Sequence, residues 1–295
     1  MKLADGVKLI TGRNGGRFPF SNSLVVSDRL LIDAGCSIEL VRELAGRVDA
    51  VVISHTHPDH AAGCWIFNEL EKDVFSPEGF ETTLESLALR FVGKELRPIW
   101  IEFVTKTMGL RDFTSQPYRD GDTVLKKPEV EAIYIPGHTA DMHAFLIDGR
   151  ILFGSDIDLT PFGPWYGHRE SNLEALLKSI RKLSELDAEI FVSGHMEPVF
   201  GRDRIAESLE KYAKVVEERN RTILQLLSEP KSLEELVSAS PIYIKKPFAR
   251  ELMDYWEARM IEKHLLVLRQ KGLVKEENGR FLTNSSVDST ARSTC

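Results

Sequence analysis

The stretch SHTHPDHAAG, from Ser54 to Gly63, places three histidines and an aspartate within positions 55–60. Histidine accounts for only 8 of the 295 residues, so this concentration is far above what composition alone would give. The apolar run DAVVIS, residues 49–54, comes directly before it and predicts a short buried strand. Pro58 cannot continue a strand ladder. The histidines are therefore predicted to lie on a loop at the carboxyl end of that strand.

This cluster has the residue types of a metal site. His55 and His57 are separated by one residue, so at a strand end their imidazoles can point to the same side. Asp59 and His60 follow after the bend at the proline. Neutral imidazole and carboxylate together suit zinc, iron or manganese better than calcium or magnesium. A metal centre therefore explains the cluster better than a polar loop that is rich in histidine by chance.

Further candidate ligands stand at the ends of other predicted strands. His138 ends AIYIPGH, Asp156 ends RILFGSD and His195 ends EIFVSGH, each with a glycine one or two positions before it. Asp33, in LLIDAG, has a similar place at an earlier strand end. Any one of these residues alone would more often be structural. Four of them beside the histidine cluster are difficult to attribute to chance.

The predicted elements fall into two halves, each with several strands followed by a helix. This order suggests two sheets packed face to face with helices outside. Residues 76–116 between the halves are expected to be helical. Ser171 and Glu174 have the spacing of a capping box at the start of the helix over residues 171–186. A long helix is predicted from Arg202 to Ser228.

A domain boundary is predicted near SEPKS, residues 228–232. After it come a short helix with a Ser232/Glu235 capping box, a longer helix, and a hairpin that turns at Asn278-Gly279. Helix, helix and two-stranded wing is the order of a winged-helix-like module. We therefore expect a catalytic domain over 1–228, this module over 229–283, and a disordered tail over 284–295.

Composition narrows the class of protein. Hydrophobic residues make up 42% and charged residues 28%, as in ordinary soluble globular proteins. The net charge of −7 argues against nucleic-acid binding through bulk electrostatics. No apolar run approaches the roughly 20 residues that span a bilayer. Three widely spaced cysteines form no disulfide framework, and the N-terminus lacks the apolar segment of a secretory signal, so we expect a cytoplasmic protein.

These motifs resemble the metallo-β-lactamase superfamily, over roughly residues 7–200. The H-x-H-x-D-H string at 55–60 is among its most specific signatures, and LIDAG, PGHT, GSD and SGH occur in the family's order. The resemblance implies an αββα sandwich, in the class α/β, with a binuclear site at one edge of the sheets. It assigns His55, His57 and His138 to one metal, Asp59, His60 and His195 to the other, Asp156 to both, and to Asp33 the orientation of a ligand imidazole.

The resemblance implies a hydrolase with two divalent transition metals. Zinc is the first expectation, and iron or manganese would also fit. Metals about 3.5–4 Å apart share a hydroxide at neutral pH, because they lower the pKa of water towards about 7. We expect a small ester, thioester or lactone as substrate. The layout resembles the lactamase-β-like group more than the glyoxalase II-like group, which hydrolyses glutathione thioesters, because the former appends a winged-helix-like tail. Asp59 is the candidate catalytic carboxylate in addition to being a ligand.

Three alternatives remain open. Persulfide dioxygenases of this superfamily use one iron, whose ligands would here be His55, His138 and Asp156. Some members of the lactamase-β-like group are endonucleases of single-stranded RNA and carry a winged-helix-like tail. A third alternative, of a different class, is a regulator whose tail binds DNA while the sandwich senses a ligand. Nucleic acid is not favoured, because the long helix after residue 248 mixes basic and acidic residues.

The segment after Asp156 is expected to contact the substrate. Trp165, Tyr166 and His168 lie there, and Tyr166 could donate to an oxyanion; the alternative is that these aromatics only cover a sheet edge. Trp100 and Phe103 are expected to form the opposite wall. His143 is interpreted as a core residue.

The apolar face of the last helix predicts an interface. Residues such as Leu252, Trp256 and Met260 are too apolar for a free helix, so they must pack against the sandwich or against a second copy in a homo-oligomer.

Overall fold

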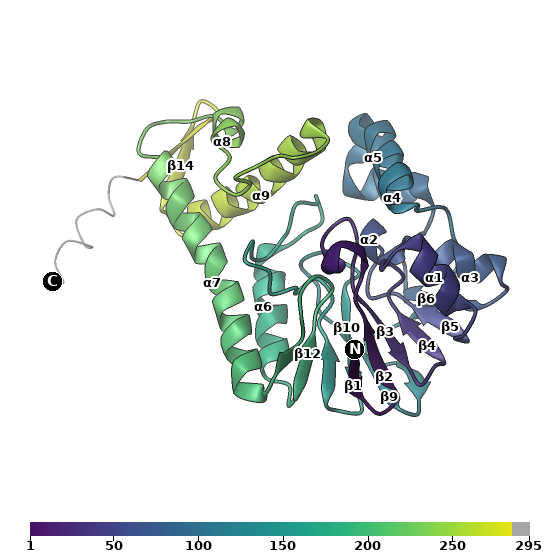
Figure 1. Cartoon of the computed structure of the whole chain (residues 1–295). Coiled ribbons are helices and arrows are strands. Elements are labelled where there is room, and N and C mark those ends of the chain that lie inside the picture. The colour runs from purple at the N-terminus through teal and green to yellow at the C-terminus, as the bar shows by residue number, and fades with distance from the viewer. Residues whose placement is uncertain (285–295) are drawn as a thin grey trace.

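The computed structural model describes residues 1–284, and two β-sheets packed face to face form its centre (Figure 1). The strands of the first sheet follow one another in chain order: β1 (Lys2–Ala4), β2 (Val7–Ile10), β3 (Ser23–Val26), β4 (Leu30–Ile32), β5 (Ala50–Val52), β6 (Asp73–Pro77) and β7 (Gln116–Tyr118). The second sheet contains β8 (Thr123–Lys126), β9 (Glu129–Tyr134), β10 (His143–Ile147), β11 (Ile151–Phe153), β12 (Ile190–Val192) and β13 (Val199–Phe200). Each sheet contains parallel pairs, from β4 to β7 in the first and between β11 and β12 in the second.

Alternating apolar side chains build the core between the sheets. In β3, Leu24 and Val26 join the central cluster, whereas Val25 between them packs with the helices outside the first sheet. In β11, Phe153 belongs to the central cluster and Leu152 to the cluster under the helices of the second sheet. Because successive side chains of a strand point to opposite faces, both faces of each sheet are buried.

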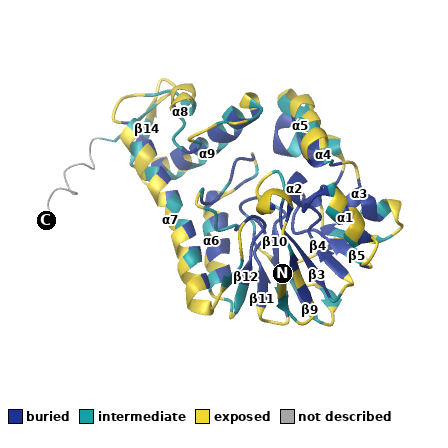
Figure 2. Ribbon diagram, in the orientation of Figure 1, coloured by how far each residue is buried: buried dark blue, intermediate teal, exposed yellow. Residues whose placement is uncertain are grey.

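Helices cover both outer faces. On the first sheet these are α1 (Ile38–Ala45) and α3 (Cys64–Glu69), and on the second α6 (Leu173–Ser184) and α7 (Arg202–Leu226). The helices α2 (Pro58–Ala61), α4 (Leu84–Phe91) and α5 (Gly93–Met108) lie beyond the strand ends of the first sheet (Figure 1). Figure 2 shows the buried sides of the helices on the outer faces turned towards the sheets and their exposed sides outward. The predicted αββα sandwich is confirmed.

The segment between the halves and the start of α6 differ in detail from the prediction. Residues 76–116 are not helical throughout, since β6 runs to Pro77 and β7 begins at Gln116. The expected cap of α6 is wrong by one residue, because Asn172 accepts a hydrogen bond from the Ala175 amide. Ser171 is therefore available for another contact, described below.

The C-terminal segment has the predicted order of elements. It contains α8 (Leu233–Ala239), α9 (Arg250–Gln270), β14 (Val274–Glu277) and β15 (Arg280–Thr283), and the Ser232/Glu235 capping box is present. The apolar clusters outside both sheets extend into α9. Met253 and Trp256 join the cluster outside the first sheet, and Leu265 and Leu268 join the cluster outside the second sheet. The winged-helix assignment and the boundary at residue 228 stay predictions. The predicted tail lies outside the described residues, apart from Asn284.

No helix within residues 1–284 is long and apolar enough to cross a membrane.

Candidate metal centre

The predicted ligands meet at one edge of the two sheets, because each follows a strand that ends there. His55 and His57 come after β5, and Asp59 and His60 lie on the single turn of α2. His138, Asp156 and His195 follow β9, β11 and β12 respectively. Their side chains form two groups, and the candidate ligand atoms within each group lie within 4.8 Å of one another: His55, His57, His138 and Asp156 in one, and Asp59, His60 and His195 in the other.

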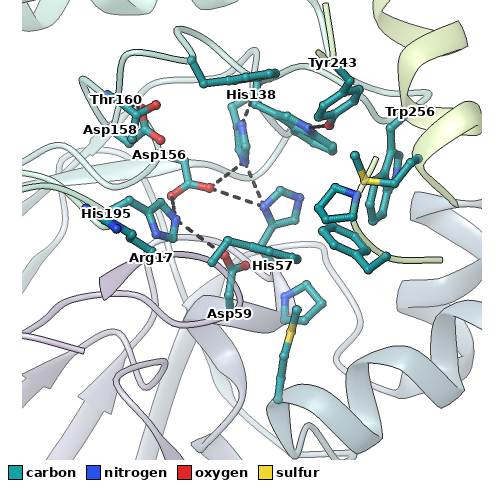
Figure 3. Close-up of a pocket in the computed structure, with 18 of the residues that line it drawn as sticks. Arg17, His57, Asp59, His138, Asp156, Asp158, Thr160, His195, Tyr243 and Trp256 are labelled. Carbon is teal, nitrogen blue, oxygen red and sulfur yellow. Dashed lines mark hydrogen bonds and ion pairs between the residues drawn. The ribbon is translucent and has the colours of Figure 1, made fainter. Parts of the chain in front are cut away.

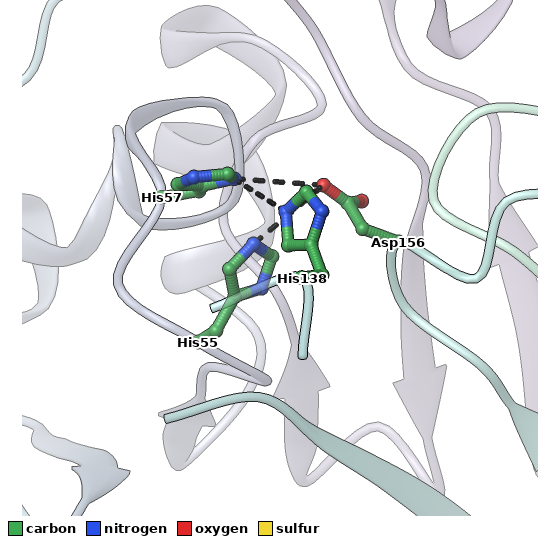
Figure 4. Close-up of side chains that lie close together, drawn as sticks. All are labelled: His55, His57, His138 and Asp156. Carbon is green, nitrogen blue, oxygen red and sulfur yellow. Dashed lines mark hydrogen bonds and ion pairs between the residues drawn. The ribbon is translucent and has the colours of Figure 1, made fainter. Parts of the chain in front are cut away.

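The Asp156 carboxylate lies between the two groups, with one oxygen towards each (Figures 3 and 4). Its Oδ2 is 3.0 Å from His138 Nε2, and 3.6 Å from both His55 Nε2 and His57 Nδ1. Its Oδ1 is 2.7 Å from His60 Nε2 and 3.3 Å from His195 Nε2.

Each imidazole has its outer nitrogen held by another group. His60 Nδ1 lies 2.6 Å from Asp33 Oδ2, and Asp33 Oδ1 also accepts from the Ser54 amide. His138 Nδ1 donates to the Trp165 carbonyl at 2.9 Å, and His195 Nδ1 to the Gly16 carbonyl at 2.7 Å. These contacts select the tautomer whose remaining nitrogen presents a lone pair to the centre.

His57 is oriented by His168. His168 Nδ1 donates to the Phe91 carbonyl at 3.2 Å, so its Nε2 accepts from His57 Nε2, 2.5 Å away. Burial holds the pKa of His168 well below its usual range, which keeps the ring neutral and able to accept. His57 Nδ1 then faces His138 Nε2 at 2.9 Å, with a lone pair on each. Two facing lone pairs repel each other unless a cation lies between them.

The donor set fits metal ions. His55 Nε2, His60 Nε2 and Asp156 Oδ1 are buried and form no hydrogen bond among the described residues, although His60 Nε2 and Asp156 Oδ1 lie only 2.7 Å apart. Buried polar atoms without partners are rare in folded proteins and point to a missing ion or ligand. Burial lowers the pKa of His55 to about 4 and that of His57 to about 3, so both are neutral donors at neutral pH. The chain therefore contains a His/Asp metal-binding cluster.

A buried ion pair that the sequence did not predict holds the loop between His55 and His57. Asp141, fully buried, accepts from the Thr56 amide at 2.9 Å and from Arg90 at 2.8 Å. Burial alone would raise the pKa of Asp141, but the charge and hydrogen bonds of Arg90 outweigh it and hold this pKa well below its usual range. Arg90 also binds Glu170.

We expect Asp141→Ala to destabilise the fold by about 3 kcal/mol, because it leaves Arg90 short of one buried partner and Thr56 without its acceptor. Urea unfolding at pH 7 measures this loss. Asp141→Asn, which keeps the volume and one acceptor oxygen, should lose less. An unchanged midpoint for the alanine variant would refute the role of this ion pair.

The prediction that Tyr166 contacts the substrate is corrected by its position in the core. Its ring is fully buried, and its hydroxyl donates to His264 Nε2 at 2.7 Å and accepts from Arg219 at 2.9 Å. His264 Nδ1 in turn donates to Asn220 Oδ1 at 2.7 Å. The hydroxyl therefore ties α7 to α9 inside the core, and it has no free direction in which to meet an oxyanion.

The same contacts predict an acid-sensitive core. Burial lowers the pKa of His264 from 6.5 to about 3. Between these values the unfolded chain binds more protons than the folded one, so stability is complete above pH 6.5 and falls as the pH drops. His264 alone should remove about 2 kcal/mol between pH 7 and pH 5. Urea unfolding should show a smaller pH dependence for His264→Gln than for the wild type, and identical slopes would count against this assignment.

A cavity of about 650 Å³ opens onto the cluster (Figure 3). Its lining includes the candidate ligands His57, Asp59, His138, Asp156 and His195, the predicted substrate residues Trp165 and His168, and the predicted wall residues Trp100 and Phe103. Tyr166 and His143 are not in this lining. His143 is buried in β10, and its Nδ1 donates to the Asp141 carbonyl at 2.8 Å.

Ser171 was predicted to cap α6, but its hydroxyl instead forms hydrogen bonds next to the metal cluster. Its hydroxyl donates to the carbonyl of His138 at 2.6 Å and accepts from the His168 amide at 3.1 Å. It therefore joins the backbones of a candidate ligand and of the residue that orients His57.

Comparison with known proteins agrees with this geometry. Residues 16–72 match the family model of the metallo-beta-lactamase superfamily. The fold is similar to that of a metallo-beta-lactamase family protein from Thermus thermophilus, with a TM-score of 0.73 and 21% identity over 96% of this chain and all of that one. It is also similar to a beta-lactamase domain protein from Burkholderia ambifaria, with a TM-score of 0.69 and 16% identity over 96% of this chain and 93% of that one.

A curated relative is the linear primary-alkylsulfatase of Pseudomonas sp. (strain ATCC 19151), 23% identical over 222 residues. The match covers 61% of this chain and 42% of that protein, so the chain spans less than half the length of this relative. The fold, the His/Asp cluster and the match over residues 16–72 thus agree with one another, and the chain is similar to metal-dependent hydrolases of the metallo-β-lactamase superfamily.

Proposed function

We propose that the protein is a binuclear metal-dependent hydrolase of an ester, thioester or lactone, with zinc as the first choice of metal. The observation that carries this proposal is the Asp156 carboxylate, which directs one oxygen to each of two ligand groups. A site for one metal would not use the second group of candidate ligands, Asp59, His60 and His195. The convergence of these three side chains therefore argues against the persulfide dioxygenase alternative.

The residues around the cavity have separate roles in this reaction. Bound divalent metals would supply Lewis-acid activation of a water nucleophile and of the substrate's reacting oxygen. Asp59 lines the cavity, which makes it the candidate acceptor of the proton that the attacking water loses. Trp165 positions His138 through its carbonyl while its side chain faces the substrate space.

The charge of the cavity favours a small organic substrate over nucleic acid. Arg17 and Lys245 are the basic residues of its lining, which also contains Asp59, Asp156 and Asp158. Recognition of single-stranded RNA depends on a positively charged groove along the backbone and on rings that stack with bases. Aromatic rings are present here, but a row of cations along the cavity is not.

Hydrolysis of an alkyl sulfate ester is the second candidate. The similarity to an alkylsulfatase over 61% of this chain favours it. An anionic sulfate would need a cation near the metals, and Arg17 lies beside His195 at that end of the cavity (Figure 3).

A substrate panel tests the proposal. Metal-loaded protein is incubated with carboxylic esters, thioesters, lactones, alkyl sulfates, glutathione persulfide and a short single-stranded RNA. The Asp156→Ala variant serves as the control for contaminating activity. We expect turnover of an ester, thioester or lactone that is absent from the variant. Turnover of alkyl sulfate alone would select the second candidate. Cleavage of RNA alone, or oxygen consumption with glutathione persulfide, would overturn the proposal.

A further inference from the structure

We propose that the cavity beside the metal cluster is a specificity site for an extended apolar group of the substrate. The inference deepens the proposed ester hydrolysis and, as a statement about substrates, rests on it. The end of the cavity away from the cluster is enclosed by apolar side chains of α5 and of the C-terminal segment: Trp100, Phe103, Val104, Met108, Met253 and Trp256. We call these six residues the apolar chamber.

A continuous row of aromatic rings leads from the cluster into this chamber. The ring of Trp165 lies 5.6 Å from that of His57, and 5.9 Å from that of Trp256 on its other side. The indole N–H of Trp165 donates to the Tyr243 hydroxyl, so its polar edge is satisfied within the protein. An apolar chain can therefore run along the face of Trp165 without unpairing that N–H, whereas the buried indole nitrogen of Trp256 has no hydrogen-bond partner among the described residues.

Rings from three separate segments line the outer end of the chamber. Phe248 stacks on Phe103 of α5, with ring centroids 5.2 Å apart and planes at 9°, and Phe18 lies 5.6 Å from Phe248. Residues 229–284 thus contribute Tyr243, Phe248 and Trp256 to the substrate space, as well as packing against the sandwich. A small polar ester would leave this apolar surface in contact with water, which an extended chain would displace.

The two ends of the cavity differ in character. In Figure 3, Asp158, Thr160 and Arg17 lie on one side of the cluster, and Trp256 and Tyr243 lie on the other. A reacting bond at Asp156 would therefore have a polar group towards Arg17 and an apolar group in the chamber. This arrangement fits an ester or thioester with an apolar chain, on either the acyl or the alcohol side.

Equilibrium binding tests the chamber without turnover. Three of the four tryptophans, Trp100, Trp165 and Trp256, line the cavity, so intrinsic fluorescence reports its occupancy. Butanoate and octanoate share one headgroup and differ by four methylenes. Each buried methylene should raise affinity roughly fourfold, so we expect octanoate to bind on the order of 100-fold more tightly.

A variant that fills the apolar chamber, compared with a matched control, tests whether octanoate binds there. Val104→Phe places bulk inside the chamber and should weaken octanoate binding about 10-fold or more, since a ring displaces several methylenes. Thr105→Phe adds the same ring at the neighbouring exposed position of α5 and should bind octanoate as the wild type does. Met253→Phe repeats the test from α9 if the first variant does not fold, as judged by thermal unfolding and metal content.

Kinetics separate this inference from the proposed reaction. Two ester series lengthen the chain from two to eight carbons, one on the acyl side and one on the alcohol side. A rise of kcat/KM with length in either series supports the chamber. Hydrolysis of short esters with no length dependence in either series, together with equal affinity for butanoate and octanoate, overturns the chamber but leaves the reaction standing. Length-dependent binding without hydrolysis of any ester, thioester or lactone overturns the reaction and keeps the apolar chamber.

Discussion

Replacing Asp156 by alanine is expected to weaken metal binding by both ligand groups and to lower kcat/KM by at least about 10³-fold. The two carboxylate oxygens face different ligand groups, so one substitution takes a donor from each. The same change leaves His55 and His60 with buried ring nitrogens that no longer have an anionic neighbour at Asp156. Loss of a metal ligand and loss of the activated nucleophile therefore coincide.

Metal content, secondary structure and activity are measured on the same preparation. Asp156→Asn serves as the graded control, because it keeps the volume and one oxygen while it removes the charge. We expect it to retain more metal than Asp156→Ala and to remain folded. If Asp156→Ala bound two metals per chain as tightly as the wild type, Asp156 would not contribute a ligand to either group.

Replacing Leu265 by aspartate is expected to leave little soluble protein. Leu265 is 3% exposed on α9 and packs in the cluster beneath α6 and α7. A buried carboxylate there has no partner and costs several kcal/mol, a large part of the stability of an ordinary domain. Leu266, its neighbour on the same helix, is 57% exposed, so Leu266→Asp should be tolerated.

The two variants are compared by their soluble yield and by thermal unfolding. The same packing predicts that a chain without residues 229–295 loses solubility, because α5 and α7 would expose the apolar surfaces that α9 covers. None of the candidate metal ligands lies in that segment. Equal yields of Leu265→Asp and Leu266→Asp would show that α9 is not part of the core. They would favour the alternative that α9 forms an interface between two copies of the chain.

The metal cluster could be predicted from the sequence because its residues lie next to strong local patterns. Positions 55–60 follow a clear strand, and His138, Asp156 and His195 each end another one. Strand ends gather at the edges of sheets, so a strand prediction also predicts which side chains meet. The αββα layers followed from the same elements, because central strands such as β3 and β11 are apolar on both faces.

What the sequence could not reveal depends on contacts between distant segments. Arg90 lies on α4 and Asp141 in the loop before β10, and nothing local to either residue indicates their ion pair. Tyr166 and His168 are two residues apart, yet one is turned into the core and the other towards His57. Ser171 had the spacing of a helix cap but binds the carbonyl of His138 instead. Side-chain direction in an irregular loop is set by packing, which periodicity does not describe.

Metal stoichiometry tests the central claim most directly. Elemental analysis of the purified wild-type chain, after exchange into metal-free buffer, gives the number and identity of tightly bound ions per protein. We predict two divalent transition metals per chain, zinc first, with the number reduced in Asp156→Ala and unchanged in Leu266→Asp. A single ion per chain, held equally well when Asp59, His60 and His195 are replaced by alanine, would contradict it.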